Sequence, residues 1–535
     1  MSPNQRLILA VVLSFVFFIV YSVIFPPEPM NGEQNMTAQP QATAATQTKT
    51  PAVSDADVGH TIAKSEKIAD ADATKLVTVE SSHFMLKIDT LGRIASKVLK
   101  DEKYFVDGKP TELIAQEGAE PLFIRFADEA INDAALHVPY AASAHAVSLD
   151  ENAQTVTLEQ KLPQLTVTKT LTFYADGHYD VAVALSKPVR YFMYVGQHAE
   201  HKGQMMMAVH GVMAYTADGV SNIFEDGDVE GRTTLRDVRL LSAFDQYFAS
   251  IFYGFGSDII VNVDRDRSDN PVAYLEASDS LELHGFIGPK DYRLLDAIDP
   301  VLVNAIEYGW FTWAAKPLFS VLMWLHGIFG NWGWAIVVLV LLIRIVLYPL
   351  TYKGMISMQK MKDLAPKMKE LREKYKGDPQ RMNAAVMELY KKHGANPMGG
   401  CLPLLLQIPV FFAIYRVLLN AVELQGADWI LWIDDLSRMD PTFILPILMG
   451  ASMYFQQRIT PNNFTDPMQE KIFKYLPVVF TFFFVTFPSG LVLYWLTNNL
   501  LSIAQQYMVN KQYAKIKALR HEAHIAEKSH DGDGA

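Results

Sequence analysis

The stretch Trp332–Tyr352, WGWAIVVLVLLIRIVLYPLTY, decides the fold class, because about 20 apolar residues in a helix cross the hydrocarbon core of a bilayer. Its one charged residue, Arg344, lies about two residues past the midpoint. A guanidinium at that depth is costly and usually faces a wet cavity or a partner. No Asp or Glu lies in any other predicted span. We therefore predict a polar groove that receives a substrate. A cation that only packs against backbone carbonyls is the alternative.

Composition indicates a mixture of membrane and soluble parts. The chain has 535 residues, too many for one domain, and half of them are hydrophobic. Residues 353–400 carry eleven Lys or Arg against five Asp or Glu, although the whole chain has a net charge of −11. This split is typical of a basic cytoplasmic loop and an exported acidic block. The single Cys401 excludes an intramolecular disulfide and a cysteine metal cluster.

The N-terminal region predicts a membrane anchor followed by a tether. The apolar run Leu7–Phe25 is longer than the core of a typical signal peptide and ends in prolines, so residues 1–25 are interpreted as an uncleaved anchor. A cleaved signal peptide is the alternative. Residues 26–75 are rich in Ala, Thr, Gln and Pro and predict a flexible linker.

Residues 76–300 predict a large antiparallel β sandwich. Apolar residues alternate along several short runs, and Asp-Gly turns separate them. In two such runs the apolar residues share one face of a strand: Tyr179, Val181, Val183 and Leu185 in one, and Leu165, Val167, Leu171 and Phe173 in the other. The histidines His198, His201 and His210 lack a carboxylate at matching spacing, so we interpret them as surface or loop residues rather than metal ligands.

Hydropathy predicts six membrane spans and one helix lying on the membrane. The amphipathic stretch 306–329 contains Lys316 and Pro317, which favours an interfacial helix over a span. The topology then places both termini and residues 353–400 in the cytoplasm, residues 76–300 outside, and the tail at 512–535 inside, where its first residues include the basic Lys515, Lys517 and Arg520. The spans are Leu7–Phe25, Trp332–Tyr352, Cys401–Ala421, Thr442–Gln457, Tyr475–Phe487 and Gly490–Val509.

Residues 353–400 predict a cytoplasmic helical hairpin. Gly377-Asp378-Pro379 breaks the first helix, and Asp378 is suited to cap the second. Methionines recur at helical spacing along the first helix: Met355, Met358, Met361 and Met368. They either hold the two helices together or offer flexible thioethers to varied apolar segments.

Three segments resemble the YidC/Oxa1/Alb3 family of membrane protein insertases. They are NPMGGCLPLLLQIPVFFAIY (Asn396–Tyr415), LPILMG (Leu445–Gly450) and FPSGLVLYWLTNNLLSIAQQY (Phe487–Tyr507). The span containing Arg344, with Tyr348-Pro349-Leu350, fits the same family, and the resemblance covers about residues 330–511. The anchor and large β domain resemble the form found in Gram-negative bacteria, which implies the inner membrane and a periplasmic β domain.

The resemblance implies a five-helix insertase core at 330–511, with a hydrophilic groove open to the cytoplasm and to lipid. Arg344 matches the groove arginine, and the other implied groove residues are Tyr348, Gln407, Phe483 and Trp495. Tyrosine is common in relatives at the position of Trp495. The implied partners are nascent membrane proteins, the Sec translocon with its accessory subunits, membrane lipids and, weakly through the hairpin and basic tail, the ribosome.

Two rival classes of function find less support. A secondary solute transporter is permitted by six spans, but the sequence shows no inverted repeat and no paired intramembrane ionisable groups. An enzyme is disfavoured because the spans lack a Ser/His, paired-Asp or HExxH arrangement, and no Walker motif is present. We expect no cofactor, no metal and no DNA partner.

Overall fold

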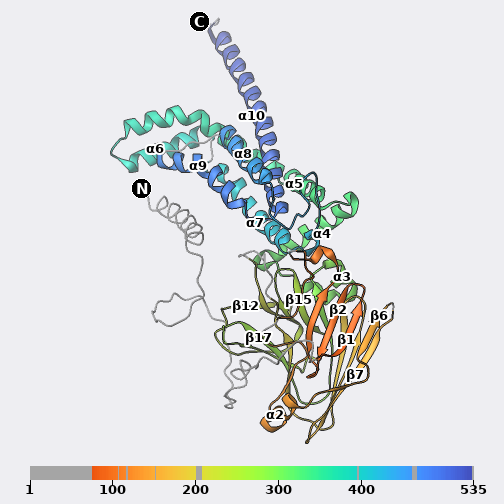
Figure 1. Cartoon of the computed structure of the whole chain (residues 1–535). Coiled ribbons are helices and arrows are strands. Elements are labelled where there is room, and N and C mark those ends of the chain that lie inside the picture. Colours follow the sequence, from red (N-terminus) through yellow and green to blue (C-terminus); the bar gives the residue numbers. More distant parts are fainter. Residues whose placement is uncertain are drawn as a thin grey trace. The chain divides into compact units, whose positions relative to one another are not determined.

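The computed structural model describes residues 75–532, except residues 107, 116–117, 151, 200–207, 395–396 and 461–466. The predicted anchor at 1–25, nearly all of the linker at 26–75, and His201 lie outside the described residues. In Figure 1 the described chain is rich in strands up to about residue 290 and helical after it.

Three sheets make up the β domain. In sheet order, the nine-stranded sheet contains β12 (Ser221–Glu225), β11 (Gly211–Thr216), β14 (Val238–Phe244), β15 (Phe248–Tyr253), β18 (Leu281–Pro289), β9 (His178–Leu185), β8 (Thr166–Phe173), β7 (Gln154–Lys161) and β5 (Ala141–Ala142). The five-stranded sheet contains β13 (Thr233–Leu235), β16 (Ile260–Arg265), β17 (Pro271–Ala277), β10 (Tyr191–Gly196) and β4 (Ile124–Phe126). The four-stranded sheet contains β3 (Ile94–Leu99), β2 (Phe84–Asp89), β1 (Lys75–Ser81) and β6 (Ala146–Leu149).

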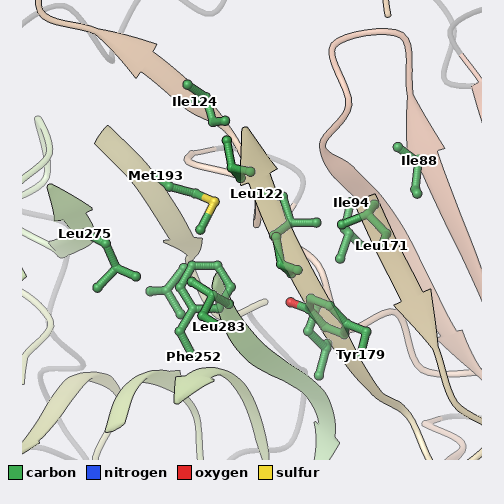
Figure 2. Close-up of a cluster of buried hydrophobic side chains, with 14 of the residues drawn as sticks. Ile88, Ile94, Leu122, Ile124, Leu171, Tyr179, Met193, Phe252, Leu275 and Leu283 are labelled. Atoms are coloured by element: carbon green, nitrogen blue, oxygen red, sulfur yellow. The ribbon is translucent and has the colours of Figure 1, made fainter. Parts of the chain in front are cut away.

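One hydrophobic core joins these sheets, which confirms the predicted β sandwich. Figure 2 shows buried side chains from all three sheets within one cluster, including Ile88, Leu171 and Leu275. The described strands pair in antiparallel fashion except for β1 and β6, which pair in parallel. The predicted alternation is also confirmed, because Tyr179, Val181 and Val183 are buried along β9.

The inward face of β8 contains a buried cation among its apolar residues. Lys169 lies on the inward face between Val167 and Leu171 and is fully buried. Its Nζ donates to the backbone carbonyls of Gly92 (2.9 Å) and Leu122 (2.8 Å). Burial lowers the pKa of this lysine to about 7, because an enclosed ammonium loses its hydration.

The second half of the described chain is helical. Its α-helices are α3 (Tyr292–Ile298), α4 (Thr312–Phe329), α5 (Trp332–Lys374), α6 (Pro379–Lys392), α7 (Pro397–Asn420), α8 (Ile444–Ile459), α9 (Pro467–Phe484) and α10 (Ser489–Gly532), and α2 (Glu129–His137) lies within the β domain. Short 3-10 helices occur at η1 (Glu102–Tyr104), η2 (Pro300–Ala305), η3 (Gly309–Phe311) and η4 (Val422–Leu424).

Helix α5 contains the whole apolar stretch Trp332–Tyr352. Asn331 caps its first turn, accepting from the backbone N–H of Trp334 at 3.1 Å. The helix continues for 43 residues, so the first helix of the predicted hairpin is a continuation of the span. Asp378 caps α6 as predicted, accepting from the N–H of Arg381 at 3.1 Å. Within the described residues, Trp332–Leu371 is the one helix both long and apolar enough to cross a membrane.

Buried hydrogen bonds connect the β domain with the helices. Gln246 Nε2 donates to the carbonyl of Leu419 at 2.8 Å, where α7 ends. The N–H of Tyr292, in the first turn of α3, donates to Glu423 Oε1 at 2.9 Å. These contacts place the connection after α7 against the end of the β domain.

Candidate functional site

The candidate site is built around Arg344 on α5. It lies twelve residues after Trp332, roughly 18 Å along the helix axis. Its Nε and one terminal nitrogen donate to Asn498 Oδ1 at 3.0 and 2.7 Å, and that nitrogen also contacts the hydroxyl of Ser502. A longer contact of 3.5 Å reaches Gln505 Oε1. These partners are neutral, so the guanidinium is satisfied without losing its net charge.

Helix α10 supplies these partners because of its spacing. Asn498, Ser502 and Gln505 are separated by four and three residues, which places them on one helix face. Ser502 and Gln505 are buried, and the amide of Gln505 also donates to Thr351 Oγ1 on α5 at 2.7 Å. The face is therefore a polar strip inside a helix pair, where each group finds a partner.

Gln407 on α7 joins the same network. Its Nε2 donates to Asn498 Oδ1 at 3.0 Å, so Asn498 accepts from both Arg344 and Gln407. A cavity of about 20 Å³, with room for about one water molecule, adjoins these groups. Its polar and aromatic lining comes from Arg344, Thr351, Gln407, Tyr494 and Asn498, and its aliphatic lining comes from Val340, Ile343, Leu347 and Val410.

The contacts that α5 makes with its neighbouring helices change from apolar to polar at Arg344. Before it, buried side chains are apolar, as at Ile336 and Leu339. After it, polar contacts to α10 continue: Gln359 with Asn510, and Asp363 with Tyr513 (2.9 Å) and Lys517 (2.8 Å). The end of α5 near Trp332 is thus closed by packing, and the polar partners extend toward the α6 end.

The remaining predicted groove residues lie elsewhere. Trp495 packs against Phe411 and Phe484, with ring centroids 4.8 and 4.9 Å apart. Phe483 lies against Phe487 at 4.7 Å in the same aromatic cluster. Tyr348 is 37% exposed and stacks on Tyr352. Of the five predicted residues, the structure brings Arg344 and Gln407 together at the cavity, and Tyr348, Phe483 and Trp495 do not line it.

Four polar residues of this network were not predicted from the sequence: Asn498, Ser502, Gln505 and Thr351. A signal was present, because polar residues spaced by four and three positions interrupt an otherwise apolar helix. Arg416 on α7 was also not predicted. That guanidinium has a carboxylate neighbour, Glu307 Oε2 at 3.8 Å, and so differs from Arg344.

Of the four methionines predicted to line the first hairpin helix, two are buried and two are half-buried. Met355 and Met368 are buried, and Met368 Sδ accepts from the hydroxyl of Tyr390 on α6 at 3.0 Å. Met358 and Met361 are half-buried. The Met368 contact supports the interpretation that methionine holds α5 and α6 together.

The β domain shows no metal centre among its described residues. His198 Nε2 lies 2.7 Å from Asp226 Oδ2, and His210 Nδ1 lies 3.8 Å from the same oxygen. Only the His198 contact is short enough for a hydrogen bond, and His210 lies within ion-pair distance of the same carboxylate.

Comparison with known proteins gives consistent results along the whole chain. Residues 324–517 match the family model "60Kd inner membrane protein", and residues 76–321 match "YidC periplasmic domain". A protein of Campylobacter jejuni named "Membrane protein insertase YidC" is 49% identical over 516 residues, covering 96% of this chain and 97% of that protein. Proteins of the same name from Wolinella succinogenes and Helicobacter pylori are 49% and 44% identical, each over 95% of this chain, covering 95% and 96% of those proteins. A solved structure titled "Active YidC insertase crystal structure with the first transmembrane domain resolved" is 20% identical, with a TM-score of 0.37, over 81% of this chain and 95% of that one.

A helical membrane domain with a polar centre, joined to a β sandwich, defines an inner-membrane protein with a large periplasmic domain. The chain belongs to the YidC family of membrane protein insertases. The resemblance found in the sequence is thereby confirmed, as is the expectation of an insertase that is not an enzyme. The clients of such a protein are nascent membrane proteins, and no comparison favours a solute transporter.

Proposed function

We propose that this chain inserts nascent inner-membrane proteins through a groove centred on Arg344. The observation that carries the proposal is a charged guanidinium held by Asn498 and Ser502, beside a small cavity and away from any carboxylate within hydrogen-bonding distance among the described residues. Such a centre attracts an anionic group without being neutralised beforehand. An acidic residue in the translocating tail of a client is the anion that fits this chemistry.

The physical problem is to carry polar groups across hydrocarbon. Each exposed backbone polar group costs several kcal/mol there, so a wet groove that reaches half the depth shortens the dry path. The attraction to Arg344 must be transient, because a dry ion pair would hold the client in place. Transfer of an apolar segment of about 20 residues into lipid drives the process. The membrane potential adds about 2.3 kcal/mol per acidic charge per 100 mV.

The polar strip supports a groove that opens on one side. Contacts from Thr351 to Asp363 link α5 to α10 through polar side chains, and the stretch before Arg344 is packed with apolar ones. We assign the α6 end to the cytoplasm because residues 353–400 are basic. The proposed topology has six spans with both termini and the α5–α6 hairpin in the cytoplasm.

Helix α4 fits an interfacial position in this topology. Trp313 and Trp324 are 73% and 61% exposed on a helix whose other face buries Phe319 and Leu322. Exposed tryptophans are typical of helices at the level of the lipid headgroups. We propose that α4 lies on the periplasmic side of the membrane.

Partners are assigned by chemistry and resemblance. The basic hairpin and the tail carrying Lys511, Lys515 and Lys517 suit anionic headgroups and, weakly, ribosomal RNA. The Sec translocon with its accessory subunits is the proposed partner for larger clients. The chain acts alone on clients with one or two spans.

The test is insertion of a single-span client with an acidic tail into liposomes containing the purified full-length protein. Arg344→Glu should abolish insertion, because it repels the tail, and Arg344→Lys should keep most of it, because charge matters more than the shape of the guanidinium. Equal activity of the two variants would reject the proposal.

Arg458→Glu provides a matched control. This arginine, at the end of α8, lies over the ring of Tyr454 at 5.0 Å and is exposed. Reversing its charge should change insertion by less than about twofold. A comparable loss in both charge reversals would point to a general electrostatic effect rather than to the Arg344 site.

A further inference from the structure

The connection between α7 and α8 presents two bulky apolar residues in an unusual conformation. Leu431 is 81% exposed with a φ of 58°, and Phe443 is 43% exposed with a φ of 58°. The left-handed region is rare for large side chains, because Cβ then crowds the backbone. Exposing a leucine and an aromatic ring to water in this conformation is unfavourable on both counts.

Hydrogen bonds hold this connection in place. The N–H of Trp429 donates to the carbonyl of Ile433 at 2.9 Å, closing a tight turn around Leu431. Before α8, Asp440 accepts from the N–H groups of Thr442 (2.9 Å) and Leu445 (2.7 Å), which brackets Phe443. The two residues are therefore held in this conformation by their surroundings.

The connection lies level with the starts of three helices. Asn331, the cap of α5, donates to the carbonyl of Asp428 at 3.1 Å, and the ring of Trp334 meets that of Trp429 at 5.8 Å. The N–H groups of Ser489 and Gly490, at the start of α10, donate to the carbonyls of Arg438 (2.7 Å) and Leu436 (2.9 Å). Phe443 itself precedes α8. Since the apolar span begins at Trp332, a bilayer crossed by α5 would have one boundary of its hydrocarbon at this level.

We propose that Leu431 and Phe443 insert into the lipid at this boundary and fix the depth of the helix ends. Lipid is the occupant because the turn is continuous with the apolar surface of the span, where Trp334 is 45% exposed beside Trp429. Tryptophan is enriched at this depth, and acyl chains remove the leucine and phenylalanine from water. The proposal depends on the chain lying in a membrane, and it does not depend on the role of Arg344.

The test uses an environment-sensitive probe, NBD, on one cysteine of the full chain. Cys401→Ser provides the background, and Leu431→Cys carries the probe in phosphatidylethanolamine–phosphatidylglycerol vesicles. A lipid carrying a shallow nitroxide should quench the probe at least twofold more than aqueous iodide does, and its emission should be blue-shifted. Val220→Cys is the matched control, since Val220 is an exposed apolar residue (49%) at the β11–β12 turn. That probe should be quenched by iodide.

Each outcome decides the question. Iodide quenching at position 431 equal to that at position 220 would overturn the proposal, because the turn would then lie in water. A blue-shifted probe that labelled lipid does not quench would also overturn it, because protein would be covering the turn. Should Leu431→Cys fail to fold, Phe443→Cys tests the same boundary with the same two quenchers. Insertion activity confirms that each labelled protein is native.

Discussion

Lys169 in the β domain and Arg344 in the helical part both lack an acid within hydrogen-bonding distance among the residues that the structure describes, but their surroundings differ. Lys169 is fully enclosed, and its partners are backbone carbonyls of Gly92 and Leu122, which cannot turn away. Arg344 is partly buried and adjoins a cavity, and it donates mainly to side chains, those of Asn498 and Ser502, with one further bond to the backbone carbonyl of Asn498 at 3.2 Å. A buried cation therefore does not by itself identify a functional site. Exchangeable partners and adjacent space distinguish Arg344 from a lysine that serves packing.

The largest effect is expected when the neutral partner of Arg344 becomes an acid. Asn498→Asp keeps the shape and places a carboxylate where Oδ1 now lies, 2.7 Å from a guanidinium nitrogen. The ion pair should cancel the attraction for an acidic tail and reduce insertion of that client at least tenfold, about 1.4 kcal/mol. Insertion rates in liposomes measure this.

Asn498→Ala is the control for this substitution. It removes the acceptor without adding charge and should lower insertion only about two- to threefold. An Asn498→Asp variant as active as the unmodified protein would show that the net charge at Arg344 is irrelevant.

The next effect concerns the stability of the β domain. Burial lowers the pKa of Lys169 and of Lys97 to about 7, whereas an unfolded lysine titrates near 10.4. The unfolded state therefore binds more protons between these values, and the free energy of unfolding rises with pH from about 7 to 10. The expected slope is at most about 1.4 kcal/mol per pH unit for each such lysine.

Lys169→Met should reduce the slope of the free energy of unfolding against pH by the contribution of one lysine. It should leave insertion unchanged. Denaturant unfolding of the full chain, followed by its β-sheet circular dichroism signal at pH 7, 8 and 9, measures the slope. An unaltered slope in the variant would mean that Lys169 keeps its proton in the folded state. Lys97 and Lys290, whose pKa burial lowers to about 7 and about 8, would then remain to be tested.

The smallest effect on insertion is expected from removing the β domain from the helical part. Deleting residues 76–289 removes the β domain but retains the hydrogen bond from Tyr292 to Glu423. Insertion of a single-span client should stay within about twofold, because the described partners of Arg344 and Asn498 all lie on α5, α7 and α10. Loss of insertion in a stably produced truncation would show that the β domain takes part.

Much of this arrangement is predictable from local patterns in the sequence. The apolar stretch around Arg344 predicts α5, and alternation along Tyr179, Val181 and Val183 predicts a half-buried strand. The cap at Asp378 is predictable because its oxygen needs only the N–H groups of the next turn. These features depend on neighbours in the chain.

Features that depend on partners distant in the sequence could not be predicted from local patterns. Lys169 occupies an inward position that alternation assigns to an apolar residue, and only the carbonyls of Gly92 and Leu122 make its burial possible. Asn498 was overlooked because its importance lies in contacts with Arg344 and Gln407, which come from two other helices. The parallel pairing of β1 with β6 likewise joins strands that β2, β3, β4 and β5 separate in the chain.

The most direct test of the central claim is photo-crosslinking from the cavity to a stalled nascent client. Leu347 lines the cavity and leaves Arg344 intact, and its neighbour Val346 is 76% exposed on another face of α5. A photoreactive residue at position 347 should cross-link to an acidic client tail several-fold more than one at position 346. The excess should vanish when the acids of the tail are made neutral. Equal cross-linking at the two positions, or an excess that survives neutralisation of the tail, would contradict an anion-attracting centre at Arg344.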